Sequence, residues 1–424
     1  MFNEDILIKK ISIQEKNQEA TLYFCKTDKF KTFYTSCIFL FDYNYLKRPV
    51  NILLAYLLDR STAKHPVEEE FIGHLYDLYD MMHSISQNQI GLIDYITFRT
   101  GTVNTKYIHE DIDLLDEAIN LLHEAIFEPS FNLEIFEEIK ESLIENINNR
   151  KNNKVSVAYD RFFNIMFENE VVNTKVLRDP AVFKNITIED LKIAYKELLE
   201  QPHIYFYVGE DDEENVVSKL SGFDFPISKE NKLNKVDSEE KEIKDVTEVI
   251  EEYNVNQSNI FIGLRTNVRS DNNDYYAMHL FNLMIGDYSN SELFRIVREK
   301  YGLSYNISSV YNPDKGYMLI RGGIGKDSFE KTYETIKEII ERYQSGDIDN
   351  DNLEITKKGV ITAIKSDLDT FSSIYNTSIA YFINGKIRTT QEKIDLINKV
   401  TTEDIKRVAN TLVLDTVYFM KGLK

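Results

Sequence analysis

The sequence repeats itself in outline, and this repeat constrains the fold more than any other feature. Three short matches occur in the same order at a nearly constant spacing: 132–135 with 352–355, 187–192 with 401–406, and 203–209 with 416–422. A single match would mean little, but three in register indicate an ancient duplication. The chain is therefore expected to contain two related units of roughly 210 residues each.

A charged stretch separates the two copies. Residues 228–252 are rich in lysine and glutamate and contain neither glycine nor proline, which is typical of a solvated linker. We therefore expect a first domain at 1–227, a linker at 228–245 and a second domain at 246–424.

Both copies mix strand-like and helix-like segments. In the first copy we expect two strands within 20–41 that are joined at 26–29, a strand at 90–103, and helices at 49–58, 66–80, 111–127 and 133–149. In the second we expect strands at 259–266 and 316–324, and helices at 274–285 and 329–343. Because the elements do not alternate as βαβ units, they predict an α+β fold with a mostly antiparallel sheet per domain and helices packed on one face.

Charge and hydropathy exclude several classes of function. The formal net charge of −20 repels phosphate backbones, so nucleic acid is not an expected partner. The longest strongly apolar run near the start, 52–58, is far too short for the roughly 20 residues that cross a bilayer. No basic and then apolar leader opens the chain, so we expect a cytoplasmic protein without membrane contact.

Two cysteines, Cys25 and Cys37, do not make a disulfide framework in a chain this long. They flank the predicted strand connection and could face each other across a hairpin. We interpret both as reduced packing residues.

Familiar catalytic motifs are missing. No two of the seven histidines have the i, i+4 spacing of a helical zinc site, and there is no Gly-x-Ser-x-Gly elbow. Residues 321–326 (RGGIGK) lack the spacing of a phosphate-binding loop, and we interpret them as a strand end whose glycines permit close backbone approach.

One segment carries a distinctive pattern, residues 291–305 (SELFRIVREKYGLSY). Leu293, Phe294 and Val297 would form the apolar side of a short helix, and Gly302 suits a left-handed terminus. Arg298 and Tyr305 bring a guanidinium and a phenol, which can both donate hydrogen bonds to a carbonyl oxygen or an oxyanion. Taken alone, the two side chains could equally be ordinary surface and packing residues.

This segment resembles the signature of the second domain of M16 (pitrilysin-type) zinc peptidases. The resemblance extends over both units, and it implies two homologous M16-type domains. It also implies that Arg298 and Tyr305 reach the substrate beside a zinc site. Residues 26–32 and 75–79 look like the noncatalytic subunits of two-chain members from Gram-positive bacteria.

The first domain of active M16 peptidases carries His-x-x-Glu-His, and the matching stretch here is degenerate. On this alignment Ile52, Ala55 and Tyr56 stand where the two histidines and the glutamate base would be. Glu145 resembles the third zinc ligand, although an exposed helix carboxylate is the simpler interpretation. The resemblance thus implies no metal in this chain, and zinc in a partner subunit that carries His-x-x-Glu-His.

The resulting hypothesis is a noncatalytic subunit of a heterodimeric zinc peptidase, without intrinsic activity. Its Arg298 and Tyr305 would bind peptide substrate and stabilise the oxyanion at the partner's zinc. The alternative is a peptide-binding or scaffold protein on a degenerate peptidase fold. The substrate stays open, as does the pathway, whether elongation-factor-P modification or peptide maturation.

Overall fold

The computed structural model describes residues 8–171, 173, 175–228, 243, 245–288, 290–367, 370–371, 374–376, 379 and 388–423. The chain divides into two compact units, each built from three separate segments. Unit 1 comprises Met1–Asn148, Val176–Val236 and Leu368–Ile387, and unit 2 comprises Asn149–Lys175, Asp237–Asp367 and Arg388–Lys424. The domains predicted above are continuous ranges of sequence, whereas the compact units are discontinuous. The predicted limits of the two repeats therefore stay a prediction.

Unit 1 is organised around a six-stranded sheet of order β1-β2-β6-β3-β5-β4. Its strands are β1 (Ile8–Gln14), β2 (Glu19–Lys26), β3 (Thr32–Asp42), β4 (Met82–Ile90), β5 (Ile93–Val103) and β6 (His203–Gly209). All neighbouring strands are antiparallel except β2 and β6, which are parallel.

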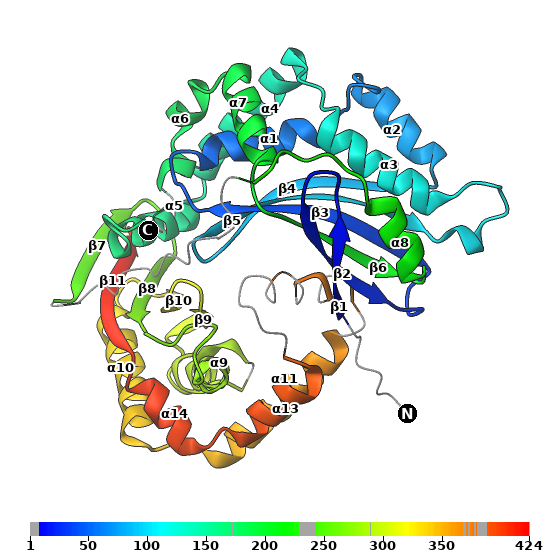
Figure 1. Ribbon diagram of the computed structural model, residues 1–424. Coiled ribbons are helices and arrows are strands. Elements are labelled where there is room, and N and C mark those ends of the chain that lie inside the picture. The colour runs from blue at the N-terminus through cyan, green and yellow to red at the C-terminus, as the bar shows by residue number, and fades with distance from the viewer. Residues whose placement is uncertain are drawn as a thin grey trace. The chain divides into compact units, whose positions relative to one another are not determined.

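Helices cover one face of this sheet, where α1, α3, α4 and α7 lie together (Figure 1). The helices of the unit are α1 (Arg48–Leu58), α2 (Glu68–Asp77), α3 (Leu114–Phe127), α4 (Leu133–Arg150), α6 (Pro180–Lys184), α7 (Ile188–Leu199) and α8 (Glu213–Leu220), with short turns η1 (Thr105–Tyr107) and η2 (Lys175–Arg178). The apolar stripe predicted for 111–127 forms α3, whose Leu115, Ile119 and Leu122 are buried in the core.

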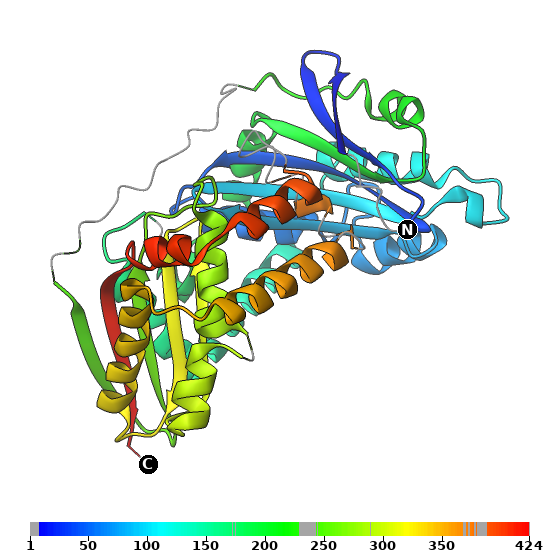
Figure 2. The ribbon, with the colours of Figure 1, turned by 90° about the horizontal axis from the view of Figure 1, so that it is seen from below.

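Unit 2 contains a five-stranded sheet of order β7-β11-β8-β10-β9. Its strands are β7 (Thr247–Tyr253), β8 (Ser258–Arg265), β9 (Ser304–Asn312), β10 (Tyr317–Ile324) and β11 (Val413–Gly422). Its helical elements are α5 (Lys154–Met166), α9 (Tyr275–Asn282), η3 (Leu283–Asp287), η4 (Leu293–Lys300), α10 (Phe329–Ser345), α11 (Asn350–Asp367), α13 (Thr390–Lys399) and α14 (Thr402–Ala409). Figure 2 shows α9 and α10 along the same face of the sheet.

Apart from the edge strand β1, the first sheet has the same strand order and directions as the second, which confirms the predicted pair of homologous α+β domains. In each sheet the last strand of the repeat, β6 or β11, is inserted between a parallel and an antiparallel neighbour. The repeated helices α7 and α14 begin with identical capping boxes, at Thr187 with Asp190 and at Thr401 with Asp404. Equivalent local sequences therefore form equivalent elements.

A second face of each sheet is covered by a short segment from the other half of the chain. In unit 2 this segment is α5, whose Phe162 ring lies 5.8 Å from Phe261 on β8. In unit 1 the covering residues are Phe371, Ile374, Tyr375 and Ile379. Tyr375 contacts Phe206, and its hydroxyl lies 2.8 Å from the Thr97 hydroxyl. The sequence did not predict α5, nor this covering of the second face.

The two strands expected within 20–41 form as β2 and β3, but the predicted hairpin between them is wrong. β6 lies between the two strands, so Cys25 is opposite Val208 and Cys37 is opposite Tyr205. The two thiols belong to clusters on different sides of the sheet. Both cysteines are free and buried, as predicted, and burial raises the pKa of the Cys25 thiol to about 12.

The expected strand at 90–103 is β5, preceded by a turn and by β4, which the sequence did not indicate. Most of the predicted linker at 228–245 lies outside the described residues. Across the part of the chain that the structure describes, no helix has the length and hydropathy needed to cross a membrane.

Candidate functional site

The signature segment forms a π-helix, η4, rather than an ordinary α-helix. The wider turn closes with hydrogen bonds such as the one that the Tyr301 amide donates to the Ile296 carbonyl oxygen, over 3.1 Å. Leu293 and Val297 are buried in the core of unit 2, and Gly302 ends the segment with a φ of 62°. The predicted left-handed glycine is confirmed. Stretches of π-helix are rare in proteins and occur often at functional sites.

A β-bulge sets the direction of Tyr305. Gly323 of β10 pairs with Asn306 of β9, but the next residue, Ile324, pairs with Ser304, so Tyr305 is an extra residue in its strand. The Asn306 side chain fixes this bulge, because its Oδ1 accepts a hydrogen bond of 3.1 Å from the Gly323 amide. An extra residue of this kind re-aims a side chain. Tyr305 is 79% exposed.

The bulge and the π-helix bring Arg298 and Tyr305 together. The Arg298 guanidinium carbon lies 5.4 Å from the centre of the Tyr305 ring and 4.5 Å from that of Phe294. Both distances suit a cation–π interaction, which holds the guanidinium at a defined place. The two predicted residues are therefore neighbours in space, although seven positions separate them in the sequence.

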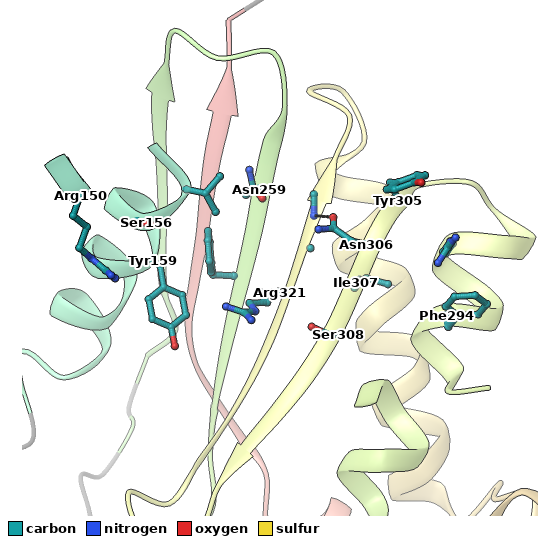
Figure 3. A pocket seen from close by; sticks show the side chains of 15 residues that line it. Arg150, Ser156, Tyr159, Asn259, Phe294, Tyr305, Asn306, Ile307, Ser308 and Arg321 are labelled. Atoms are coloured by element: carbon teal, nitrogen blue, oxygen red, sulfur yellow. Dashed lines mark hydrogen bonds between the residues drawn. The ribbon is translucent and has the colours of Figure 1, made fainter. Parts of the chain in front are cut away.

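Arg298 and Tyr305 line a pocket within unit 2 that has a volume of about 670 Å³. Figure 3 shows that its wall is formed by α5 on one side, by the strands β8, β10 and β9, and by η4 on the other side. Besides the two predicted residues it is lined by polar side chains that the sequence did not single out: Arg150, Tyr159, Asn259, Asn306 and Arg321.

The three arginines of the pocket differ in their partners. Arg150 forms two hydrogen bonds with the Asp160 carboxylate, over 3.0 and 2.9 Å, and these raise the pKa of Arg150. The guanidinium groups of Arg298 and Arg321 have neither an ion pair nor a hydrogen bond among the described residues. The Arg321 guanidinium lies 5.6 Å from the centre of the Tyr159 ring.

The degenerate metal positions lie on α1 in unit 1. Ala55 is buried in the core, Ile52 is half-buried, and Tyr56 is 47% exposed. Ile52 and Ala55 carry no atom that binds a metal ion, so this stretch does not fit the zinc of the family's motif. Glu145 is exposed on α4. Within the described ranges, no three His, Cys, Asp or Glu side chains are grouped so that they could hold a metal ion.

Comparison with known proteins gives the class of the chain. Residues 185–360 match the family model described as Peptidase M16 inactive domain. With the shared fold of the whole chain, this match confirms the resemblance to M16 peptidases: the chain is M16 peptidase-like, and its residues 185–360 match the domain that the family model describes as inactive.

Individual relatives support this classification. The chain is 28% identical to the probable inactive metalloprotease YmfF of Bacillus subtilis, and the match covers 97% of each chain. This agrees with the resemblance of 26–32 and 75–79 to noncatalytic subunits of Gram-positive bacteria. A conserved protein from Enterococcus faecalis superposes with a TM-score of 0.85 at 23% identity, over 97% of this chain and 98% of that one. The peptidase M16 inactive domain from Pseudomonas fluorescens gives 0.75 at 15% identity, over 98% and 99%.

Proposed function

We propose that this protein is the noncatalytic subunit of a heterodimeric M16-type zinc peptidase that processes peptides in the cytoplasm. The partner subunit would carry His-x-x-Glu-His and hold the zinc ion. This chain would contribute Arg298 and Tyr305, which bind the substrate and stabilise the oxyanion that forms during cleavage.

The observation that supports this proposal most is the state of Arg298 and Tyr305. A guanidinium and a phenol lie side by side at an open pocket, and among the described residues neither makes a hydrogen bond. Both side chains are exposed, so their donors are accessible to a ligand. Donors that are left available, and are held in place by a π-helix and a bulge, are suited to an external carbonyl oxygen.

The degenerate helix α1 supports the division of labour. Ile52 and Ala55 supply no ligand, and neither they nor Tyr56 is a carboxylate that could act as base, so zinc chemistry would depend on another chain. A pocket with substrate-binding donors on a chain with a degenerate metal motif is what a shared active site requires of one of its two subunits.

Co-expression tests the proposal. The chain is produced with an M16 protein of the same organism that contains His-x-x-Glu-His, and complex formation is measured by size-exclusion chromatography. Peptidase activity is then compared for each chain alone and for the mixture. The proposal expects a 1:1 complex that cleaves peptides when neither chain alone does. A complex that binds peptides without cleaving them would favour the scaffold function instead.

A further inference from the structure

The floor of the pocket carries a second group of donors that the proposed function does not use. We infer that Arg321, with Asn259 beside it, binds a carboxylate of the peptide substrate, so that the pocket selects acidic peptides. This inference rests on the proposed function, because it takes the pocket as the place where the substrate chain lies.

Arg321 differs from the other residues of its strand in exposure and in charge. The residues before it on β10, from Tyr317 to Ile320, are buried, while Arg321 is exposed and faces the pocket (Figure 3). It is the only charged residue in β10. An arginine has a planar guanidinium whose paired N–H groups match the two oxygens of a carboxylate. Tyr159 of α5 lies against this guanidinium, which restricts the side chain before a ligand arrives.

Asn259 provides an independent observation. It is 8% exposed and lines the pocket, and its Nδ2 is buried without a hydrogen-bond partner among the described residues. A buried donor without an acceptor destabilises the fold, so the position is unfavourable unless a ligand supplies an oxygen. In the pairing of β8 with β10, Asn259 is opposite Gly323 and diagonal to Arg321. Such diagonal neighbours are about 7–8 Å apart, within reach of one ligand group.

The charge around these donors favours an anion. The formal net charge of the protein is −20, yet none of the described Asp and Glu residues lines the pocket, and Asp160 is already paired with Arg150. Arg298 and Arg321 therefore carry two positive charges that have no counterion among the residues that the structure describes. A carboxylate could come from an Asp or Glu side chain or from the end of the peptide chain, and both sources offer the same pair of oxygens.

Three matched peptides test the inference and separate the two sources. The first is acetyl-Ala-Leu-Glu-Leu-Ala-amide, with an internal acid. The second replaces Glu with Gln and has a free terminal carboxylate, and the third combines Gln with a terminal amide and is neutral. Binding of each to the purified full-length chain is measured by isothermal titration calorimetry. We expect at least one charged peptide to bind about tenfold or more tightly than the neutral one, as charge-assisted hydrogen bonds allow.

Variants then assign the preference to Arg321. Arg321→Gln should remove the preference and leave the affinity for the neutral peptide unchanged, whereas Arg321→Lys keeps the charge but loses the paired donors and should retain only part of it. Lys326→Gln removes the same charge from an exposed position outside the pocket and should keep the full preference. Asn259→Leu should weaken only the charged peptides. Equal thermal midpoints for Arg321→Gln and wild type show that the fold is intact.

The inference is overturned if no charged peptide binds, if all three peptides bind equally, or if the preference persists in Arg321→Gln. These outcomes are distinct from a failure of the proposed function. A heterodimer whose turnover depends on Tyr305 but whose subunit ignores peptide charge would contradict the inference alone. An Arg321-dependent preference in a chain that never forms an active complex would contradict the proposed function alone.

Discussion

Tyr305 and Arg298 offer the sharpest test at the scale of single residues. Donors that act on a developing oxyanion affect turnover more than ground-state binding. Tyr305→Phe removes only an exposed hydroxyl, so the heterodimer should still assemble while its kcat falls by about 10²–10³. Arg298→Ala should lower kcat at least as much and also raise KM. Steady-state kinetics of the purified complexes measure both effects.

Tyr301→Phe is the matched control for this prediction. Tyr301 lies on the same segment and is 41% exposed, but it does not line the pocket. Its variant should keep wild-type kinetics. If Tyr305→Phe and Arg298→Ala also cleave at the wild-type rate in intact complexes, the transition-state role is wrong.

His83 on β4 is expected to make unit 1 sensitive to acid. Its ring nitrogens are buried, and desolvation lowers its pKa from 6.5 to about 4. In the unfolded chain His83 binds a proton below about pH 6.5, but in the native protein it does so only near pH 4. Its contribution to the free energy of unfolding is therefore fully present above pH 6.5 and is lost as the pH falls towards 4. The total contribution of this residue is about 3 kcal/mol.

Replacing His83 by Phe keeps a ring against Phe71, 5.1 Å away, and removes the titration. Urea unfolding followed between pH 7 and about pH 4.5 should therefore show a flatter pH dependence for His83→Phe than for wild type. The exposed His109 serves as the control, and His109→Gln should follow the wild-type curve. Parallel curves for His83→Phe and wild type would contradict the assignment.

Only part of the pocket could be predicted from individual residues. Arg298 and Tyr305 lie in one continuous motif, so a sequence pattern finds them. Tyr159, Asn259 and Arg321 come from three elements that are distant in the sequence, and only the fold brings them to one pocket. Arg321 is the only charged residue in the strand 317–324, and this could have indicated a functional side chain. The glycines that follow it led instead to an interpretation as a strand end with close backbone packing.

At the scale of elements, the close packing of α5 on β8 gives a prediction about stability. A Cβ at Gly263 would come within 2.6 Å of the Met166 sulfur and 2.8 Å of the Phe162 ring. Gly263→Val should therefore push α5 away from the sheet and destabilise unit 2 by about 1–3 kcal/mol. Met166→Ala should cost about 2–5 kcal/mol when introduced alone.

In the double variant, Gly263→Val with Met166→Ala, the alanine leaves room for the valine. The loss in free energy of unfolding should therefore be smaller than the sum of the two single losses by more than about 0.5 kcal/mol. Denaturant unfolding of the four proteins measures this coupling. Gly73→Ala on the exposed helix α2 is the control, because a Cβ there meets nothing within 4 Å and should be neutral or stabilising. Additive losses would show that α5 does not pack on Gly263 as described.

Helices with a clear apolar period, such as α3, were predictable because the pattern is local. The pairing of β2 with β6 was not, because β6 follows β2 by more than 170 residues and no local signal reveals an inserted strand. A polar turn between two strands favours a hairpin only when nothing else can pair with them. The fold class nevertheless followed from the sequence, since the repeat limited the topology to two copies of one arrangement.

For the molecule as a whole, the degenerate α1 predicts the behaviour of the isolated chain. We expect the purified protein to bind no stoichiometric zinc and to cleave no peptide, because Ile52, Ala55 and Tyr56 do not provide the motif. Elemental analysis after dialysis, together with a peptidase assay in the presence and absence of a chelator, measures both properties. About one tightly held zinc ion per chain, or chelator-sensitive cleavage by the lone protein, would refute this.

In each unit the second face of the sheet is covered by a segment from the other half of the chain, and this affects the order in which the protein can fold during synthesis. The strands of the first sheet are complete once β6 has left the ribosome, but Ile374, Tyr375 and Ile379, which pack on the second face of that sheet, are synthesised much later. In the other direction, α5 is made long before β8 exists to receive it. Domains that fold as they emerge ordinarily finish from the N-terminus onwards. Here the growing chain must carry an uncovered apolar surface while more than a third of its residues are still being added, and its two halves mature together at the end.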